Sequence, residues 1–130
     1  MRRFRYLPAL FLTVASISVP VLAHHSTAAY DYTKMVPLSG TVVNFQWTNP
    51  HMFIHVAVQS KGKTMVYAIE SGTPNINVRH GWKKNDLKPG DKVKLVIRPM
   101  RDGSLGGTLD NIMLADGRQL WGPAHDIAPQ

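Results

Sequence analysis

The chain of 130 residues contains no cysteine. This absence excludes disulfide bonds, thiolate metal ligands, cysteine nucleophiles and thiol redox chemistry. A domain of about 100 residues can bury enough surface to fold without cross-links or structural metals. The hydrophobic share of 44% and the charged share of 18% are typical of such a globular domain.

Recognisable catalytic motifs are also absent. The sequence has no Gly-x-Ser-x-Gly elbow, no phosphate-binding loop and no paired-carboxylate spacing. Most of the eight acidic residues lie in predicted turns, where aspartate bonds the local backbone. Glu70 ends a predicted strand, where it could cap the next helix or face a groove. We expect it to cap the helix, since no spacing pairs it with a histidine. The sequence therefore predicts a protein that is not an enzyme.

A basic stripe with interleaved aromatic residues is missing as well. The chain has 15 basic and 8 acidic residues. Removal of the first 23 residues would take Arg2, Arg3 and Arg5 with it, leaving 12 basic residues against 8 acidic ones and a net charge of +4. The remaining lysines are scattered, so the sequence argues against a nucleic-acid partner.

The one long apolar run lies at the start of the chain, at residues 7–22. Three arginines precede it, and Val21 and Ala23 supply the small residues expected around a signal-peptidase cleavage site. The run is shorter than the ~20 residues that a spanning helix needs. We therefore expect a signal peptide at residues 1–23 and a periplasmic mature protein with no membrane span. A retained membrane anchor is the alternative.

Alternation of apolar and polar residues predicts a series of β-strands after the first 40 residues. The expected strands are residues 41–47, 51–58, 64–70, 92–98 and 108–114, with a last hairpin to 120–121. The inward faces are expected to carry Val43, Phe45 and Trp47, then Met52, Ile54, Val56 and Val58. Thr73-Pro74 predicts the start of a short helix that ends near Gly81, with Ile76 and Trp82 facing the core.

This order predicts a mainly β fold. Three strands, one short helix and two or three further strands are typical of a small five- or six-stranded barrel of the oligonucleotide/oligosaccharide-binding (OB) type, a Greek-key barrel with the helix between strands 3 and 4. A small β-sandwich would give a similar strand count. We expect an extended lead-in at residues 24–37, the barrel at 38–121 and a flexible tail at 122–130.

Several motifs carry a family resemblance through nearly the whole predicted mature chain. They include His24-His25-Ser26, Trp47-Thr48-Asn49-Pro50-His51, Gly72-Thr73-Pro74-Asn75, Leu87-Lys88-Pro89-Gly90-Asp91 and Arg101-Asp102-Gly103. With them the chain resembles an uncharacterised family of exported bacterial proteins that is defined only as a domain of unknown function. The resemblance implies export and this type of domain, and it implies no activity.

Cleavage after Ala23 would make His24 the first residue. An amino-terminal histidine can chelate a metal through its α-amine and its Nδ1 atom, and a further imidazole completes a T-shaped set of three nitrogens, a histidine brace. Such nitrogen-rich tetragonal sites suit Cu(II). His25 offers an alternative set in which the amine, a backbone amide nitrogen and its imidazole bind Cu(II).

Two histidines in the second predicted strand are candidates for the further ligand. His51 and His55 lie on the face opposite Met52 and Ile54. They are about 13 Å apart in a regular strand, at ~3.3 Å per residue, which is too far for both to bind one ion. We expect His51 to bind, because the Asn49-Pro50 turn can redirect it. The alternative is that all four histidines are solvated surface residues.

An exposed ligand platform is the second hypothesis. Phe53, Arg101 and Trp121 are expected on the barrel face and its loops, where barrels of this type bind their ligands. The sequence therefore predicts a non-catalytic periplasmic binding protein with copper as its candidate cofactor. The alternative is a metal-free module that binds a small ligand or an envelope protein.

Overall fold

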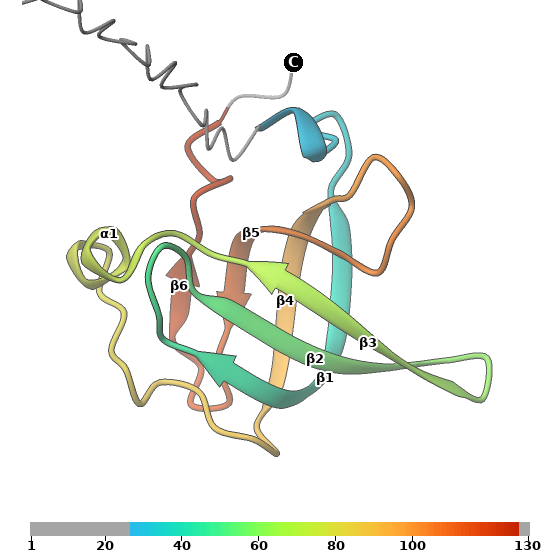
Figure 1. Cartoon of the computed structure of the whole chain (residues 1–130). Coiled ribbons are helices and arrows are strands. Elements are labelled where there is room, and N and C mark those ends of the chain that lie inside the picture. The colour runs from blue at the N-terminus through green and yellow to red at the C-terminus, as the bar shows by residue number, and fades with distance from the viewer. Residues whose placement is uncertain (1–26, 128–130) are drawn as a thin grey trace, which may run out of the picture.

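The computed structural model describes residues 27–127 (Figure 1). Its elements are η1 (Thr27–Ala29), β1 (Val36–Gln46), β2 (Phe53–Ser60), β3 (Lys63–Glu70), α1 (Pro74–Arg79), β4 (Lys92–Pro99), β5 (Gly106–Met113) and β6 (Gln119–Trp121). This order confirms the mainly β fold with one short helix between the third and fourth strands. No helix in the described part of the chain is long and apolar enough to cross a membrane.

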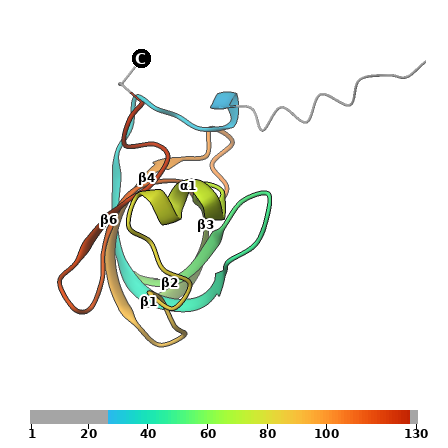
Figure 2. The ribbon, with the colours of Figure 1, turned by 90° about the vertical axis from the view of Figure 1, so that its left-hand side faces the viewer.

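Five of the strands close into a barrel (Figure 2). The strands follow the order β3-β2-β1-β4-β5-β6 through antiparallel pairs, and a short parallel pairing of β3 with β5 closes the ring. The closing strands are very near each other, because a Cβ atom on Gly106 would lie 2.4 Å from the carbonyl oxygen of Ala68. The expected OB-like Greek-key barrel is confirmed, with β6 as an extra strand beside β5.

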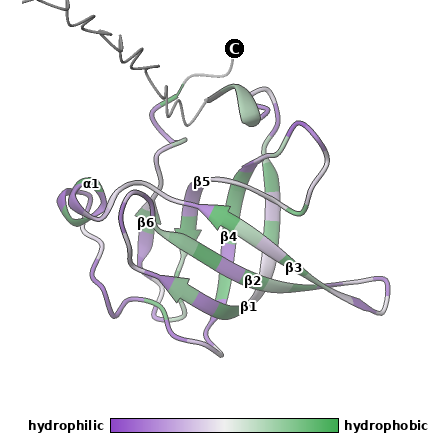
Figure 3. Ribbon diagram, in the orientation of Figure 1, coloured by the Kyte–Doolittle hydropathy of each residue, from purple (hydrophilic) through white to green (hydrophobic). Residues whose placement is uncertain are grey.

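Hydrophobic and hydrophilic residues alternate along the strands, as the banded colouring of the ribbon shows (Figure 3). On β2 and the residue before it, the expected inward face is buried, since Met52, Ile54 and Val56 are each 0% exposed and Val58 packs against the core. Core side chains from the other elements include Leu38, Ile69, Trp82, Leu95, Ile97, Leu109 and Ile112.

A β-bulge in β1 corrects the expected face of the first strand. The register with β2 shifts between Val42 and Asn44, so Val43 is an extra residue that the partner strand does not match. Val42 is consequently 2% exposed and Val43 is 47% exposed. The assignment of Val43 to the inward face was wrong, whereas Phe45 and Trp47 do pack against the core.

The helix begins as expected and buries a different face. The hydroxyl oxygen of Thr73 accepts a hydrogen bond from the Ile76 amide at 3.3 Å, so Thr73 caps the helix and the capping role expected of Glu70 was wrong. Ile76 is 46% exposed, contrary to expectation, because the buried face of α1 carries Asn77 instead. Trp82 follows the helix and is buried as expected.

The segments that flank the barrel are packed against it. Tyr30 forms an antiparallel bridge with Met100, and η1 precedes it, so the lead-in is not extended throughout. After β6, the Ala124 amide donates to the carbonyl oxygen of Leu109, and Ala124 is completely buried. The first part of the segment expected to be a flexible tail therefore lies against β5.

Candidate functional site

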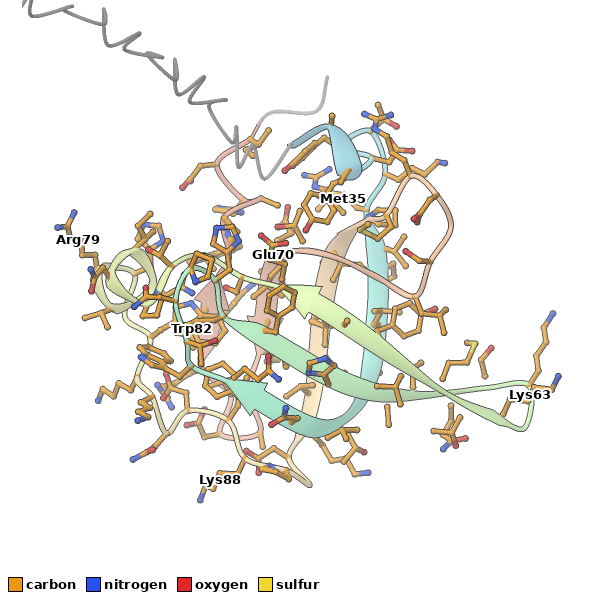
Figure 4. All side chains as sticks on the ribbon, viewed as in Figure 1. Met35, Lys63, Glu70, Arg79, Trp82 and Lys88 are labelled. Atoms are coloured by element: carbon orange, nitrogen blue, oxygen red, sulfur yellow. The ribbon has the colours of Figure 1, made fainter. Side chains whose placement is uncertain are left out.

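Three side chains from separate segments meet at the end of β3. The hydroxyl of Tyr30 donates a hydrogen bond to Oε2 of Glu70, and Nδ1 of His51 contacts Oε1 of the same carboxylate. The side chains of His51 and Glu70 are 20% and 18% exposed, so the contact is only partly open to solvent. Figure 4 shows Glu70 toward the end of the barrel on which η1 lies. We call these three residues the Glu70 cluster.

Strand register explains how Glu70 and His51 come together. Glu70 follows the buried Ile69, so its side chain lies on the outer face of β3. Phe53 is its partner on β2, and His51 precedes Phe53 by two residues. Alternation along the predicted strands contained this signal. Tyr30 lies outside the main strands, so no periodic pattern pointed to it.

The cluster keeps the Tyr30 hydroxyl protonated. Burial, the hydrogen bond to Glu70 and the charge of that carboxylate all raise the pKa of Tyr30 well above its ordinary value of 10.0. The pKa of Tyr32 is raised as well, chiefly by burial and then by the charge of Glu70. Tyr30 is therefore a stable hydrogen-bond donor that holds one oxygen of the carboxylate, while the other oxygen contacts His51.

Backbone contacts attach the N-terminal segment to this end of the barrel. The Arg101 amide donates to the carbonyl oxygen of Ala29 at 2.9 Å, and the Asp31 amide donates to that of Pro99 at 2.8 Å. His24 and His25, two of the expected metal ligands, lie outside the described residues. His24 is six positions before Tyr30, and six residues span at most about 20 Å.

Metal-ligating side chains are sparse in residues 27–127. In this range no group of three or more histidine, aspartate or glutamate side chains is placed to hold an ion. His55, the other expected strand ligand, pairs with Ala68 rather than with Glu70, and its Nδ1 atom is buried without a hydrogen-bond partner in the described part of the chain. The contacts of Glu70 are with His51 and Tyr30. The structure thus separates the two strand histidines.

A cavity of about 240 Å³ lies beside the Glu70 cluster. Phe53, Tyr30, Glu70 and Met100 line it together with Leu105. Of the three residues expected to form a ligand platform, only Phe53 belongs to this wall. Exposed Arg101 lies in the turn after β4, and Trp121 lies on β6, where its ring stacks on that of His125 at a centroid distance of 3.8 Å.

Comparison with known proteins identifies a family without an assigned role. The family of unknown function DUF6152 matches residues 12–110, about three quarters of the chain. No curated protein and no solved structure matches. Because the match covers most of the barrel as well as the segment before it, the chain belongs to the family DUF6152.

Proposed function

We propose that this protein is an exported, non-catalytic binding protein that holds one copper ion between the mature amino terminus and His51. The observation that carries the proposal is the contact between Nδ1 of His51 and the carboxylate of Glu70. Histidines that bind metals commonly direct their second ring nitrogen at a carboxylate, which fixes the tautomer and the ring orientation. With its proton on Nδ1, His51 carries the ligating lone pair on Nε2.

The rest of the ligand set comes from the segment before the described residues. Signal-peptide cleavage after Ala23 would give His24 a free α-amine, and this amine with Nδ1 of His24 would add two nitrogens to that of His51. Three nitrogens in a T-shaped arrangement suit Cu(II), which leads the affinity order of the divalent first-row ions. Tyr30 belongs to the Glu70 cluster, and the six residues from His24 to Tyr30 span at most about 20 Å. The amino terminus would therefore lie within about 20 Å of Tyr30.

The proposal of a non-catalytic role rests on the contacts of the Glu70 carboxylate. Each of its oxygens has a partner, His51 on one side and Tyr30 on the other. The carboxylate therefore positions an imidazole, and the Tyr30 hydroxyl holds the carboxylate in turn. Export through residues 1–23 would deliver this arrangement to the periplasm.

A metal-free ligand module is the second candidate. The cavity of about 240 Å³ beside the cluster favours it, because Phe53 and Met100 give the wall an apolar part and Glu70 gives it one charged group. On this alternative, Phe53→Ala would abolish binding of a small ligand while His24→Ala would leave it unchanged.

A Cu(II) titration of the processed protein tests the proposal. We expect one equivalent to bind tightly when His24 is the first residue and has a free α-amine, and binding to weaken by at least tenfold when that amine is acetylated. The acetylated form keeps every side chain and removes only the chelating amine of His24. Equal affinity in both forms, or purified mature protein that begins at another residue, would refute the proposal.

A further inference from the structure

A second concavity lies on the outer surface of the barrel, and no residue of the Glu70 cluster lines it. A groove of about 560 Å³ runs over the outer surface of β2, β1, β4 and β5. Its polar and apolar walls come from Ser39, Thr41, Gln59, Lys92, Lys94 and Met113. This volume is within the usual range for sites that hold small molecules. We call it the lysine groove.

Strand pairing sets the side chains of the lysine groove in rows. Lys92 is the partner of Thr41 across β1 and β4, and Lys94 is the partner of Ser39 on one side and of Met113 on the other. The alternating residues Val93 and Leu95 face the core, so both lysines point outward. Each hydroxyl therefore has a lysine opposite it.

Small residues form the floor of the lysine groove. Ala57 pairs with Thr41 and contributes a single methyl group to the floor. Gly40 lies between the two hydroxyl residues, and a Cβ atom there would be 2.4 Å from the carbonyl oxygen of Ala57. Glycine thus lets β1 and β2 approach closely beneath the groove.

The charge of the lysine groove has one sign. Lys92 and Lys94 line it, and no aspartate or glutamate does. Nζ of Lys92 donates a hydrogen bond to the hydroxyl oxygen of Thr41 at 2.6 Å, which holds this ammonium group over the groove. Residues two apart on a strand are about 6.6 Å apart, so both ammonium groups can approach one anion. The site is complementary to a compact negative charge.

The position of the groove also narrows the class of ligand. It lies on the faces of strands that already pair on both sides, β2 with β1 and β3 and β4 with β1 and β5. A peptide therefore has no free strand edge here to extend, which removes the usual way in which a sheet binds an extended chain. A small molecule fits the concavity better.

We infer that the lysine groove binds a small phosphorylated molecule of about the size of a sugar phosphate. The two ammonium groups would hold the phosphate as point charges. The hydroxyls of Ser39 and Thr41 and the amide of Gln59 would bond the hydroxyl groups of the carrier, and Met113 would cover its apolar side. This site is separate from the Glu70 cluster and does not depend on copper.

Glucose 6-phosphate is a suitable probe, with glucose and glucuronate as matched ligands that lack the phosphate. We expect NMR titration of the metal-free mature protein to shift the amide signals of Ser39, Thr41 and Lys94. The double substitution Lys92→Gln with Lys94→Gln should weaken binding at least tenfold. Its control, Lys83→Gln with Lys84→Gln, removes the same charge from two exposed lysines that do not line the groove.

Equal weakening in both double variants would overturn the inference, because it would leave only a general charge effect. Binding of glucose or glucuronate as tight as that of glucose 6-phosphate would overturn the phosphate assignment. All four lysines are exposed, so the fold should persist, and Thr41→Val gives a second, uncharged change in the groove. Copper affinity should be the same in every one of these variants, which separates this test from that of the proposed function.

Discussion

At the scale of single residues, Glu70 connects the barrel to the segment that precedes it. Its carboxylate accepts a hydrogen bond from Tyr30 in the lead-in and contacts His51 in the loop before β2. Sequence reasoning selected His51 as the strand ligand, and alternation could also have placed Glu70 beside it. The role of Tyr30 could not be predicted, because its backbone makes only an isolated bridge with Met100, and such a contact has no periodic pattern.

Tyr30 offers a spectroscopic test of this cluster. We expect its phenol, followed by NMR of ¹³Cζ-labelled tyrosine, to titrate well above pH 10. The substitution Glu70→Gln should lower the pKa of Tyr30, since it removes the charge that opposes ionisation. Tyr30→Phe assigns the signal. A Tyr30 resonance that titrates near pH 10 in the unchanged protein would contradict the hydrogen bond to Glu70.

The same shift has a defined effect on stability. A raised pKa means that the folded protein keeps the Tyr30 proton at pH values where the unfolded chain, with a pKa near 10.0, has lost it. The contribution of Tyr30 to the free energy of unfolding is therefore complete below pH 10 and declines as the pH rises above it. Tyr30→Phe should make stability less dependent on pH in that alkaline range.

At the scale of the elements, the strands were predictable because one face of each is consistently apolar. The prediction failed where a local feature changed the period. An unmatched residue in β1 moved Val43 outward, and α1 is only six residues long, too short for a helical period to identify its buried face. Thr73 was recognisable as the cap because that signal depends on residue type and the following proline.

Gly40 tests the close approach of β1 and β2. We expect Gly40→Ala to lower the free energy of unfolding by about 1–3 kcal/mol, because the added methyl group would overlap the backbone of Ala57 and a methyl group of Val56. Urea denaturation measures the change. Ser39→Ala, at an exposed neighbouring position, is the control and should alter stability by less than about 0.5 kcal/mol. Similar values for the two variants would argue against this packing.

At the scale of the whole molecule, a buried ion pair ties the lead-in to the barrel. Arg98 donates to Asp110 through Nε and Nη2 at 3.2 and 3.1 Å, and its Nη1 donates to the carbonyl oxygen of Tyr32 at 2.9 Å. Arg98 and Asp110 are 4% and 2% exposed. The barrel strands β4 and β5 thus hold the segment that carries Tyr30.

Removal of the carboxylate should destabilise the fold strongly. We expect Asp110→Asn to reduce the free energy of unfolding by about 3–5 kcal/mol, since a buried guanidinium would lose its counter-charge. Asp126→Asn makes the same chemical change at an exposed position and should have little effect. Chemical denaturation of both variants gives the comparison, and a small loss in Asp110→Asn would show that the pair contributes little to stability.

Closure of the barrel was predictable from the number and order of the elements, whereas the neighbours of the amino-terminal segment were not. The sequence alone did not predict which residues of the barrel lie near the amino-terminal segment. In the structure, the bond of Ala29 to the turn after β4, the bond of Asp31 to Pro99 in β4 and the contact of Tyr30 with Glu70 hold residues 29–31 at the end of the barrel where Glu70 lies. Such contacts depend on loop conformations that no alternation of residue types encodes.

Pulsed electron paramagnetic resonance of the Cu(II) protein, with His24 as the first residue, tests the central claim most directly, because it counts coordinated imidazoles. The account predicts two imidazoles in the unchanged protein, one after His51→Ala and two after His55→Ala. A spectrum that His51→Ala leaves unchanged would contradict it and would assign the copper to the amino terminus alone.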